Sequence, residues 1–359
     1  KILIGSTISI AIIVAALVAI PYFFKDDIVK FTQQQINDNI NAYVSFNDVN
    51  LSLIKSFPNL QVGLENLQVV GKETFKGVKL ADVKSFDITV NLAALWKNYK
   101  DAKEPIIIKK LAINNATINA LVQPNGQANW DITLPSDATD TTIENEEAPP
   151  FMLQLKSYKL SDCNIVYDDQ SSHTFMKIDG LTHKGKGNFN DLIYDIATNT
   201  TINALSLAYD GISYFNKTRL DAAIDLNIDN GKAKYVFKNN SVTLNALQLK
   251  FDGSVAIPND KDMVLDLEFD APQAEVKDIW SMIPAAYTKD YDQVKSSGKV
   301  TCKGNVKGVY NDTSMPNFAV NLGIQNGRVQ YPDLPKAIEA INLHLNVDKK
   351  EGDLNNMVI

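Results

Sequence analysis

The residues best suited to chemistry in this chain are its three histidines. His173, His183 and His344 lie in segments that read as strands or turns, and only His173 has acids close by, Asp168 and Asp169. A metal or acid–base site is conceivable there, but solvated polar residues beside a turn explain the same pattern. The sequence contains no H-E-x-x-H, G-x-S-x-G or phosphate-loop motif. It therefore predicts no catalytic site, no metal, no cofactor, and a protein that is not an enzyme.

The remaining reactive or aromatic candidates also have ordinary explanations. Cys163 and Cys302 are far apart and belong to no CxxC or Cys/His cluster, so they are either two small buried thiols or a disulfide. The acids between Asp225 and Asp229 alternate with apolar residues, as on the wet face of a strand, and lack the tight clustering of a calcium loop. Trp130 is interpreted as a packing residue at a turn, with a binding platform as the alternative.

Composition narrows the class of protein further. The chain has 359 residues, 45% of them hydrophobic and 21% charged, which is typical of a globular protein with one large or two smaller folded parts. The net charge is −7 and the pI is about 5.1, which argues against nucleic acid as a partner. The sequence has no run of basic residues that would indicate a patch for binding lipid headgroups.

The first segment predicts a membrane anchor. Ile2 to Phe24 carries no charged residue and ends in Tyr22, Phe23 and Phe24, followed by Lys25 and two aspartates. About 20 apolar residues are needed to cross a bilayer as a helix, and aromatic residues favour its interfaces. A cleaved signal peptide would have a shorter apolar run and a small-x-small cleavage site. A buried soluble helix is a poorer alternative because the run has no polar face. The flanking charges favour a cytoplasmic N-terminus.

After the anchor the chain predicts a short helix and then strands. Residues 25–41 have helical spacing, with Ile28, Phe31, Gln35, Ile36 and Ile40 near one stripe. From residue 42 the period is two, with shifts of phase that indicate bulges. Short helices are expected at 92–99 and 274–287. Turns are expected at Asn125-Gly126, Asp229-Asn230-Gly231, Asp252-Gly253 and Asn326-Gly327. We expect the anchor at 1–24, the helix at 25–41, a first β segment at 42–134, an acidic linker at 135–150 and a second β segment at 151–359.

A weak internal repeat supports a sheet built from repeated units. Residues 111–118, LAINNATI, resemble 158–165, YKLSDCNI, and both resemble 320–329, VNLGIQNGRV. Each copy has alternating apolar positions, then a small residue (Ala116, Cys163 or Gly327) and a β-branched residue two positions later. Generic strand alternation can produce such a pattern by chance.

Several segments resemble the start of the AsmA family. They are the apolar N-terminus, then Val49-Asn-Leu-Ser-Leu53, Phe57-Pro-Asn-Leu-Gln-Val62, Leu80-Ala-Asp-Val83, Ile88-Thr-Val-Asn-Leu-Ala-Ala-Leu95, Ile107-Ile-Lys-Lys-Leu111 and Asn125-Gly-Gln-Ala-Asn-Trp-Asp131. The last is the most recognisable. The resemblance covers the first 135 residues; beyond them the likeness is only in strand repetition. Members are usually longer, so a further C-terminal part is expected.

The resemblance implies a mostly β fold: an N-terminal transmembrane helix followed by an elongated, curved, repeating-groove antiparallel sheet with a few short helices. It also implies a single-pass inner-membrane protein with its bulk in the periplasm, which handles phospholipid between the two membranes. Without the resemblance, alternating strands would more simply face an ordinary protein core. The alternative function is a scaffold or assembly factor for an envelope machine, with a protein partner at a sheet edge. The candidate lipid-facing residues are Val62, Leu64, Ile88, Val90, Ile106, Ile108, Ile113 and Ile118.

Overall fold

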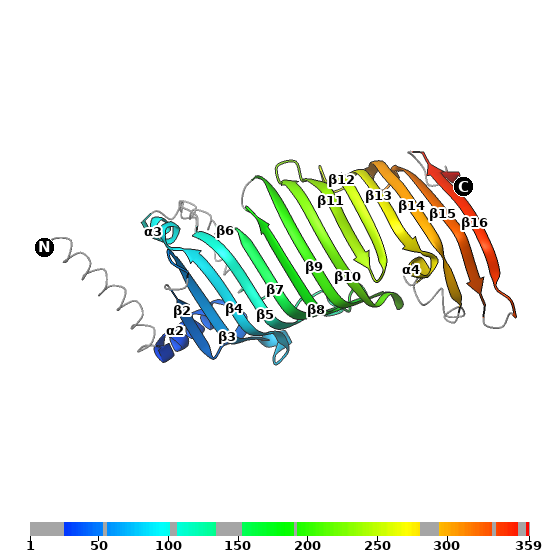
Figure 1. Ribbon diagram of the computed structural model, residues 1–359. Helices are drawn as coiled ribbons and strands as arrows, with labels where there is room; N and C mark the ends of the chain where they lie inside the picture. Colours follow the sequence, from blue (N-terminus) through cyan, green and yellow to red (C-terminus); the bar gives the residue numbers. More distant parts are fainter. Residues whose placement is uncertain are drawn as a thin grey trace. The chain divides into compact units, whose positions relative to one another are not determined.

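The computed structural model describes residues 25–52, 56–100, 106–133, 153–189, 192–280, 294–331, 335–350 and 357–358 (Figure 1). The chain divides into two compact units, residues 1–172 and 173–359. Most described residues lie in strands, as the period of two predicts, and the few helices are short. The expected anchor at 1–24 and linker at 135–150 lie outside the described residues.

Unit 1 is a single layer of strands with two helices beside it (Figure 1). Strands β1 and β2 both pair with β3, and β3, β4 and β5 follow as antiparallel neighbours. The elements are α2 (Lys25–Asn39), β1 (Ala42–Ser45), β2 (Asp48–Ser52), β3 (Asn59–Gly71), the 3-10 turn η1 (Glu73–Phe75), β4 (Lys79–Asn91), α3 (Leu92–Lys100), β5 (Ile106–Val122), β6 (Leu153–Leu155) and β7 (Ser157–Asp169).

The sheet of unit 1 is not wholly antiparallel, which corrects the prediction. Strand β5 pairs with β6 and with β7 in parallel. A parallel neighbour requires a crossover of a dozen or more residues between the two strands. The long connection from Val122 to Leu153 supplies it, and its acidic, proline-rich composition gave no sign of a crossover.

The parallel pair joins two copies of the internal repeat. Leu111 pairs with Tyr158 and Ile118 with Ile165, a constant offset of 47 residues (158 − 111), which is the offset of the sequence repeat itself. The two copies therefore lie side by side, position against position. The repeat is a real structural unit in these two strands.

A row of residues with left-handed backbone, which we call the crease, crosses the sheet of unit 1. Asn66 in β3, Asn115 in β5 and Asp162 in β7 have φ values of 53°, 50° and 52°, in the left-handed region that asparagine and aspartate tolerate better than most residues. The strand registers place all three in one row. The row explains the phase shift between Leu64 and Leu67, because the left-handed residue returns the next apolar side chain to the same face.

Side-chain hydrogen bonds to the backbone hold the two helices of unit 1. Helix α2 lies along β1, with Asn37 Nδ2 donating to the Val44 carbonyl at 3.0 Å and Gln33 Nε2 to the Phe46 carbonyl at 2.6 Å. Phe31 and Gln35, two residues of the predicted stripe, are exposed on α2. Helix α3 begins at an asparagine cap, where Asn91 Oδ1 accepts the Ala94 amide at 2.9 Å.

Unit 2 is also a single layer, in which consecutive strands pair antiparallel (Figure 1). Its elements are β8 (Thr174–Gly187), β9 (Ile193–Tyr209), β10 (Ile212–Asp229), β11 (Lys234–Leu244), β12 (Leu247–Ala256), β13 (Met263–Glu275), α4 (Val276–Trp280), β14 (Lys295–Tyr310), β15 (Asn317–Gln330), β16 (Ile338–Lys349) and β17 (Met357–Val358). Of the helix expected at 274–287, residues 276–280 are helical and 281–287 lie outside the described residues.

Two of the expected turns are strand interiors instead. Gly253 lies inside β12 with φ 126°, and Asn326 lies inside β15 with φ 50°. Both are places where a strand bends without reversing, and a dipeptide that suits a tight turn also suits a bend because both need positive φ. Asn125-Gly126 and Asp229-Asn230-Gly231 do form turns.

Candidate functional site

One face of the unit 1 sheet is apolar across its strands. Directly paired residues in neighbouring strands point to the same face, so the register assigns the faces. Four rows are apolar in every strand they cross. We call these four rows, together with the row beside the crease that contains Val83, Ala116 and Cys163, the unit 1 apolar face. The rows are Leu60, Val90, Ile108 and Leu155; Val62, Ile88, Leu111 and Tyr158; Leu64, Phe86, Ile113 and Leu160; and Val69, Ala81, Ile118 and Ile165.

All eight sequence-predicted site residues lie on this face. Val62 pairs with Ile88, and Val90 pairs with Ile108. A register shift at Lys109 keeps Ile108 on the same face as the residues beyond it. Leu64, Ile113 and Ile118 occupy other rows of the same face. Ile106, two residues before Ile108 on β5, extends this face by one further position, where it pairs with Leu153. The structure thus brings the eight side chains together on one surface.

The opposite face of unit 1 is polar. Gln61, Thr89 and Lys110 form one row, and Glu65, Ser85, Asn114 and Ser161 form another. Its groups bond to one another along and across strands: Asp87 accepts from Gln61 at 3.2 Å and from Ser85 at 2.7 Å. The sheet is therefore amphipathic, with one wetted face.

The outer rows of the unit 1 apolar face are mostly half-buried, except at Ile108, which is buried, and the face is buried beside the crease. Val83, Ala116 and Cys163, beside the crease, are only 5%, 1% and 1% exposed, whereas Val62, Ile88 and Ile113 are half-buried. Small side chains on the inside of a bend come together and are shielded by their larger neighbours. We infer that the sheet bends toward its apolar face, which makes that face concave.

Unit 2 carries a second face of the same kind, which we call the unit 2 apolar face. Its rows are mainly apolar between β10 and β16, with glycine at Gly253, Gly304 and Gly308. Two buried polar residues interrupt the rows: Asn240 pairs with Phe251, and Lys349 pairs with Phe318. The apolar and glycine members are Leu226, Phe237, Gly253, Leu267, Val306 and Phe318; Ile228, Tyr235, Val255, Leu265 and Gly308; Phe251, Phe269, Gly304, Val320 and Val347; and Ala271, Cys302, Leu322 and Leu345.

Rings and one short helix cover parts of the unit 2 apolar face. A Cβ on Gly304 would lie 2.4 Å from Cζ of Phe269, so the ring lies directly over the glycine. The rings of Phe237 and Phe251 are in contact, with centroids 5.6 Å apart. Helix α4 packs Val276 and Ile279 against a buried cluster of Ala271, Ala274 and Val300. Most other side chains of this face are half-buried.

The predicted site residues included none of the unit 2 apolar face. The same alternation was visible in its strands, for example at Leu265, Leu267 and Phe269. The prediction stopped at residue 118 because the family resemblance covered only the first part of the chain. Period two alone contained the signal.

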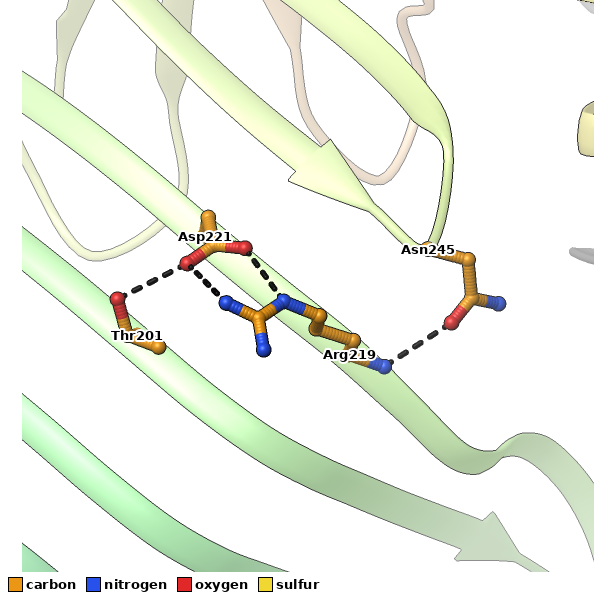
Figure 2. A network of polar contacts seen from close by, with 4 residues as sticks. All are labelled: Thr201, Arg219, Asp221 and Asn245. Atoms are coloured by element: carbon orange, nitrogen blue, oxygen red, sulfur yellow. Dashed lines mark hydrogen bonds and ion pairs between the residues drawn. The ribbon is translucent and has the colours of Figure 1, made fainter.

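The polar face of unit 2 holds its charges in pairs. In Figure 2, Asp221 accepts from Arg219 Nε at 2.9 Å and from Thr201 Oγ1 at 2.9 Å, while the Arg219 amide donates to Asn245 Oδ1 at 3.0 Å. Burial raises the pKa of Asp221, but the hydrogen bonds from Arg219 and Thr201 outweigh it, and the pKa falls below its usual value. This side of the sheet is suited to water.

A polar pair also lies in a row of the unit 2 apolar face. His183 Nδ1 lies 2.8 Å from Thr200 Oγ1, in the row that continues through Ala222 and Val242. Burial lowers the pKa of His183 from its ordinary value, which favours the neutral imidazole.

The candidate chemical groups found in the sequence have structural roles. Asp169 closes the turn after β7, where hydrogen bonds from Ser171 and Ser172 hold its pKa far below the usual range. His173 occupies that turn with φ 53°. Among the described residues, no cluster of His, Cys, Asp or Glu side chains could hold a metal ion. Cys163 and Cys302 are both free thiols, so the open question of a disulfide is answered.

The Asn125–Asp131 motif builds a polar cavity of about 710 Å³ at one end of unit 1, with Lys72 and Glu73 on its other wall. Asn129 is 3% exposed; its Oδ1 accepts the Leu121 amide at 2.9 Å and its Nδ2 donates to the Asn119 carbonyl at 2.8 Å. Trp130 packs against Tyr167 with ring centroids 5.9 Å apart, as expected of a packing residue at a turn. The motif ties the chain back onto β5.

None of the helices in the described part of the chain is long and apolar enough to span a bilayer. The predicted anchor precedes that part.

The comparison with known proteins gives one match. A family model described as "AsmA family" matches residues 1–273. No curated protein and no solved structure matches the chain.

Proposed function

Because the chain belongs to the AsmA family, we propose that its apolar faces bind phospholipid acyl chains and conduct lipid between the inner and outer membranes. Membership of this family supports, as part of the proposal, a membrane-associated envelope protein without enzymatic activity. In this proposal residues 2–24 hold the protein in the inner membrane, and the sheets lie in the periplasm.

The observation that carries the proposal is the continuous apolar face of each unit. An antiparallel sheet usually buries such a face against a second layer. Here Val62, Ile88 and Ile113 are only half-buried, and no second sheet covers them among the described residues. A face of this kind is suited to a partner that is itself apolar and adaptable in shape.

The energetics favour acyl chains as that partner. Exposing a lipid tail to water costs about 0.8 kcal/mol for each CH2. Neighbouring strands lie about 4.8 Å apart. A lipid tail that moves across the strands along one row therefore leaves one apolar side chain and meets the next on the neighbouring strand. The wetted opposite face keeps the sheet compatible with an aqueous compartment.

The test is photo-cross-linking from matched neighbouring positions in the full chain. Benzoylphenylalanine placed at Ile88 lies on the unit 1 apolar face, and at Thr89 it lies on the polar face. Leu267 and Glu268 form the same matched pair in unit 2. After irradiation of cells grown with labelled phosphate, we expect a labelled phospholipid adduct at Ile88 and Leu267 and little at Thr89 and Glu268. Equal labelling of both faces would contradict the proposal.

A scaffold for an envelope machine is the second candidate, and the half-buried apolar faces favour it as well, because such a face also suits a protein partner. A protein adduct in place of lipid at Ile88 and Leu267 would support this function and reject lipid conduction.

A further inference from the structure

Helix α3 and the turn before β3 expose two large aromatic side chains at one end of unit 1. Trp96 on α3 is 60% exposed and Phe57 is 80% exposed. The register places them at the same end, because Asn59 at the start of β3 pairs with Asn91, where β4 ends and α3 begins. Large apolar side chains exposed together indicate an interaction surface.

The charge beside these aromatics is positive. Helix α3 has no acid in its first turn and has Lys97 and Lys100 in its last, both exposed. The ammonium of Lys100 lies 5.1 Å from the centre of the Trp96 ring. In a chain of net charge −7, a helix with two cations and no acid is a local exception. Tryptophan and lysine together are typical of the headgroup level of a bilayer.

Helix α2 points toward this end of unit 1. Its Asn37 bonds to Val44, whereas the earlier Gln33 bonds to Phe46, so α2 runs antiparallel to β1. Its N-terminus therefore points in the direction in which β1 and β2 run, toward the end of the sheet where β3 begins. The apolar segment Ile2–Phe24 directly precedes α2 in the sequence.

We propose that α3 and Phe57 form a second membrane contact, which rests on the surface of the bilayer that holds the N-terminal segment. Trp96 and Phe57 enter the headgroup region, and Lys97 and Lys100 pair with anionic lipid phosphates. The contact fixes this end of the unit 1 apolar face at the lipid surface. It rests on the proposed membrane anchoring and goes beyond it, since a single anchor would leave the sheet free to pivot.

The test uses tryptophan fluorescence in the full chain, which has three tryptophans. Trp130→Phe with Trp280→Phe leaves Trp96; Trp96→Phe with Trp280→Phe leaves Trp130. Trp130 is a matched control because it is 43% exposed but lies at the other end of unit 1, in the cavity that also includes Gly71 at the end of β3. Both proteins are reconstituted into vesicles of phosphatidylcholine and phosphatidylglycerol, with part of the phosphatidylcholine brominated near the headgroup.

We expect bromine to quench Trp96 emission at least about twofold and to leave Trp130 nearly unchanged. Lys97→Glu with Lys100→Glu should reduce the quenching in these anionic vesicles. Equal quenching of Trp96 and Trp130, or none of either, would overturn the proposal.

A further variant separates this proposal from lipid conduction. Ile118→Asp places a charge on the unit 1 apolar face at the other end of the strands, because Ile118 pairs with Ala81 near the start of β4 whereas α3 follows the end of β4. We expect Ile118→Asp to leave the quenching of Trp96 unchanged, even if lipid cross-linking on that face is lost. Loss of Trp96 quenching in a folded Ile118→Asp protein would assign the quenching to lipid on the apolar face and overturn the membrane contact.

Discussion

At the scale of single residues, the polar side chains of this protein mainly hold the backbone in place. Asn37, Asn91 and Asn129 each bond to main-chain groups at a helix or strand end. Sequence alone predicted Asn125-Gly126 as a turn, but it did not reveal the role of Asn129. That role depends on a strand running alongside the motif, which no local pattern specifies.

Replacing Asn129 by alanine should destabilise unit 1. The change leaves the Leu121 amide and the Asn119 carbonyl without their partner in a buried place, which costs about 2 kcal/mol. Urea unfolding followed by circular dichroism measures the loss. Asn125→Ala, at an exposed position of the same motif, is the control and should change the free energy of unfolding much less; equal losses would refute the role given to Asn129.

At the scale of elements, left-handed residues decide how each strand bends. The apolar period of two was readable from the sequence, and it placed the eight candidate side chains on one face. The bends were partly readable, as a shift of phase at Leu64 and Leu67. Asp252-Gly253 and Asn326-Gly327 were misread as turns, because a bend and a turn require the same backbone conformation. The parallel pairing of β5 and β7 is decided by a long crossover that carries no periodic signal.

The bend at Gly253 gives a test at this scale. With φ at 126°, an alanine there would place Cβ 2.0 Å from the Asp266 carbonyl oxygen. We expect Gly253→Ala to lower the free energy of unfolding by about 1–3 kcal/mol, measured by urea unfolding. Gly211→Ala is the comparison: Gly211 also has positive φ but has open space around it, so its loss should be smaller. A larger loss at Gly211 would contradict the steric account.

At the scale of the whole molecule, each unit repeats the same design of one apolar and one wetted face. Composition and charge argued against nucleic acid as a partner, and the family resemblance suggested the envelope. The number of units and their boundary at Ser172 and His173 were not readable, because strands of both units have the same alternation. The candidate site was predicted only in unit 1 because the family resemblance covered only the first 135 residues, although the strands of unit 2 show the same alternation.

The two free thiols give a test at this scale, one in each unit. Alkylation of the unfolded, unreduced chain should modify both Cys163 and Cys302, because no disulfide joins the units. In the folded chain Cys163 should be protected, since it is 1% exposed. Burial, with a smaller effect from Asp270, raises the pKa of Cys302, so its labelling should be slow at pH 7 and accelerate as the pH rises. Mass spectrometry of the labelled peptides checks all three outcomes; an unfolded, unreduced chain in which neither cysteine is modified would reject the free thiols.

The pairing of β5 with β7 also bears on ancestry. Two segments of similar sequence lie next to each other in the same direction, in step along their length, so the second continues every row that the first begins. Duplication of a gene segment in tandem would reproduce this arrangement without further mutations, since the copied strand pairs with the original strand position by position. A sheet of this kind can lengthen by duplication, one module at a time, and keep its two-sided character from the moment the copy appears.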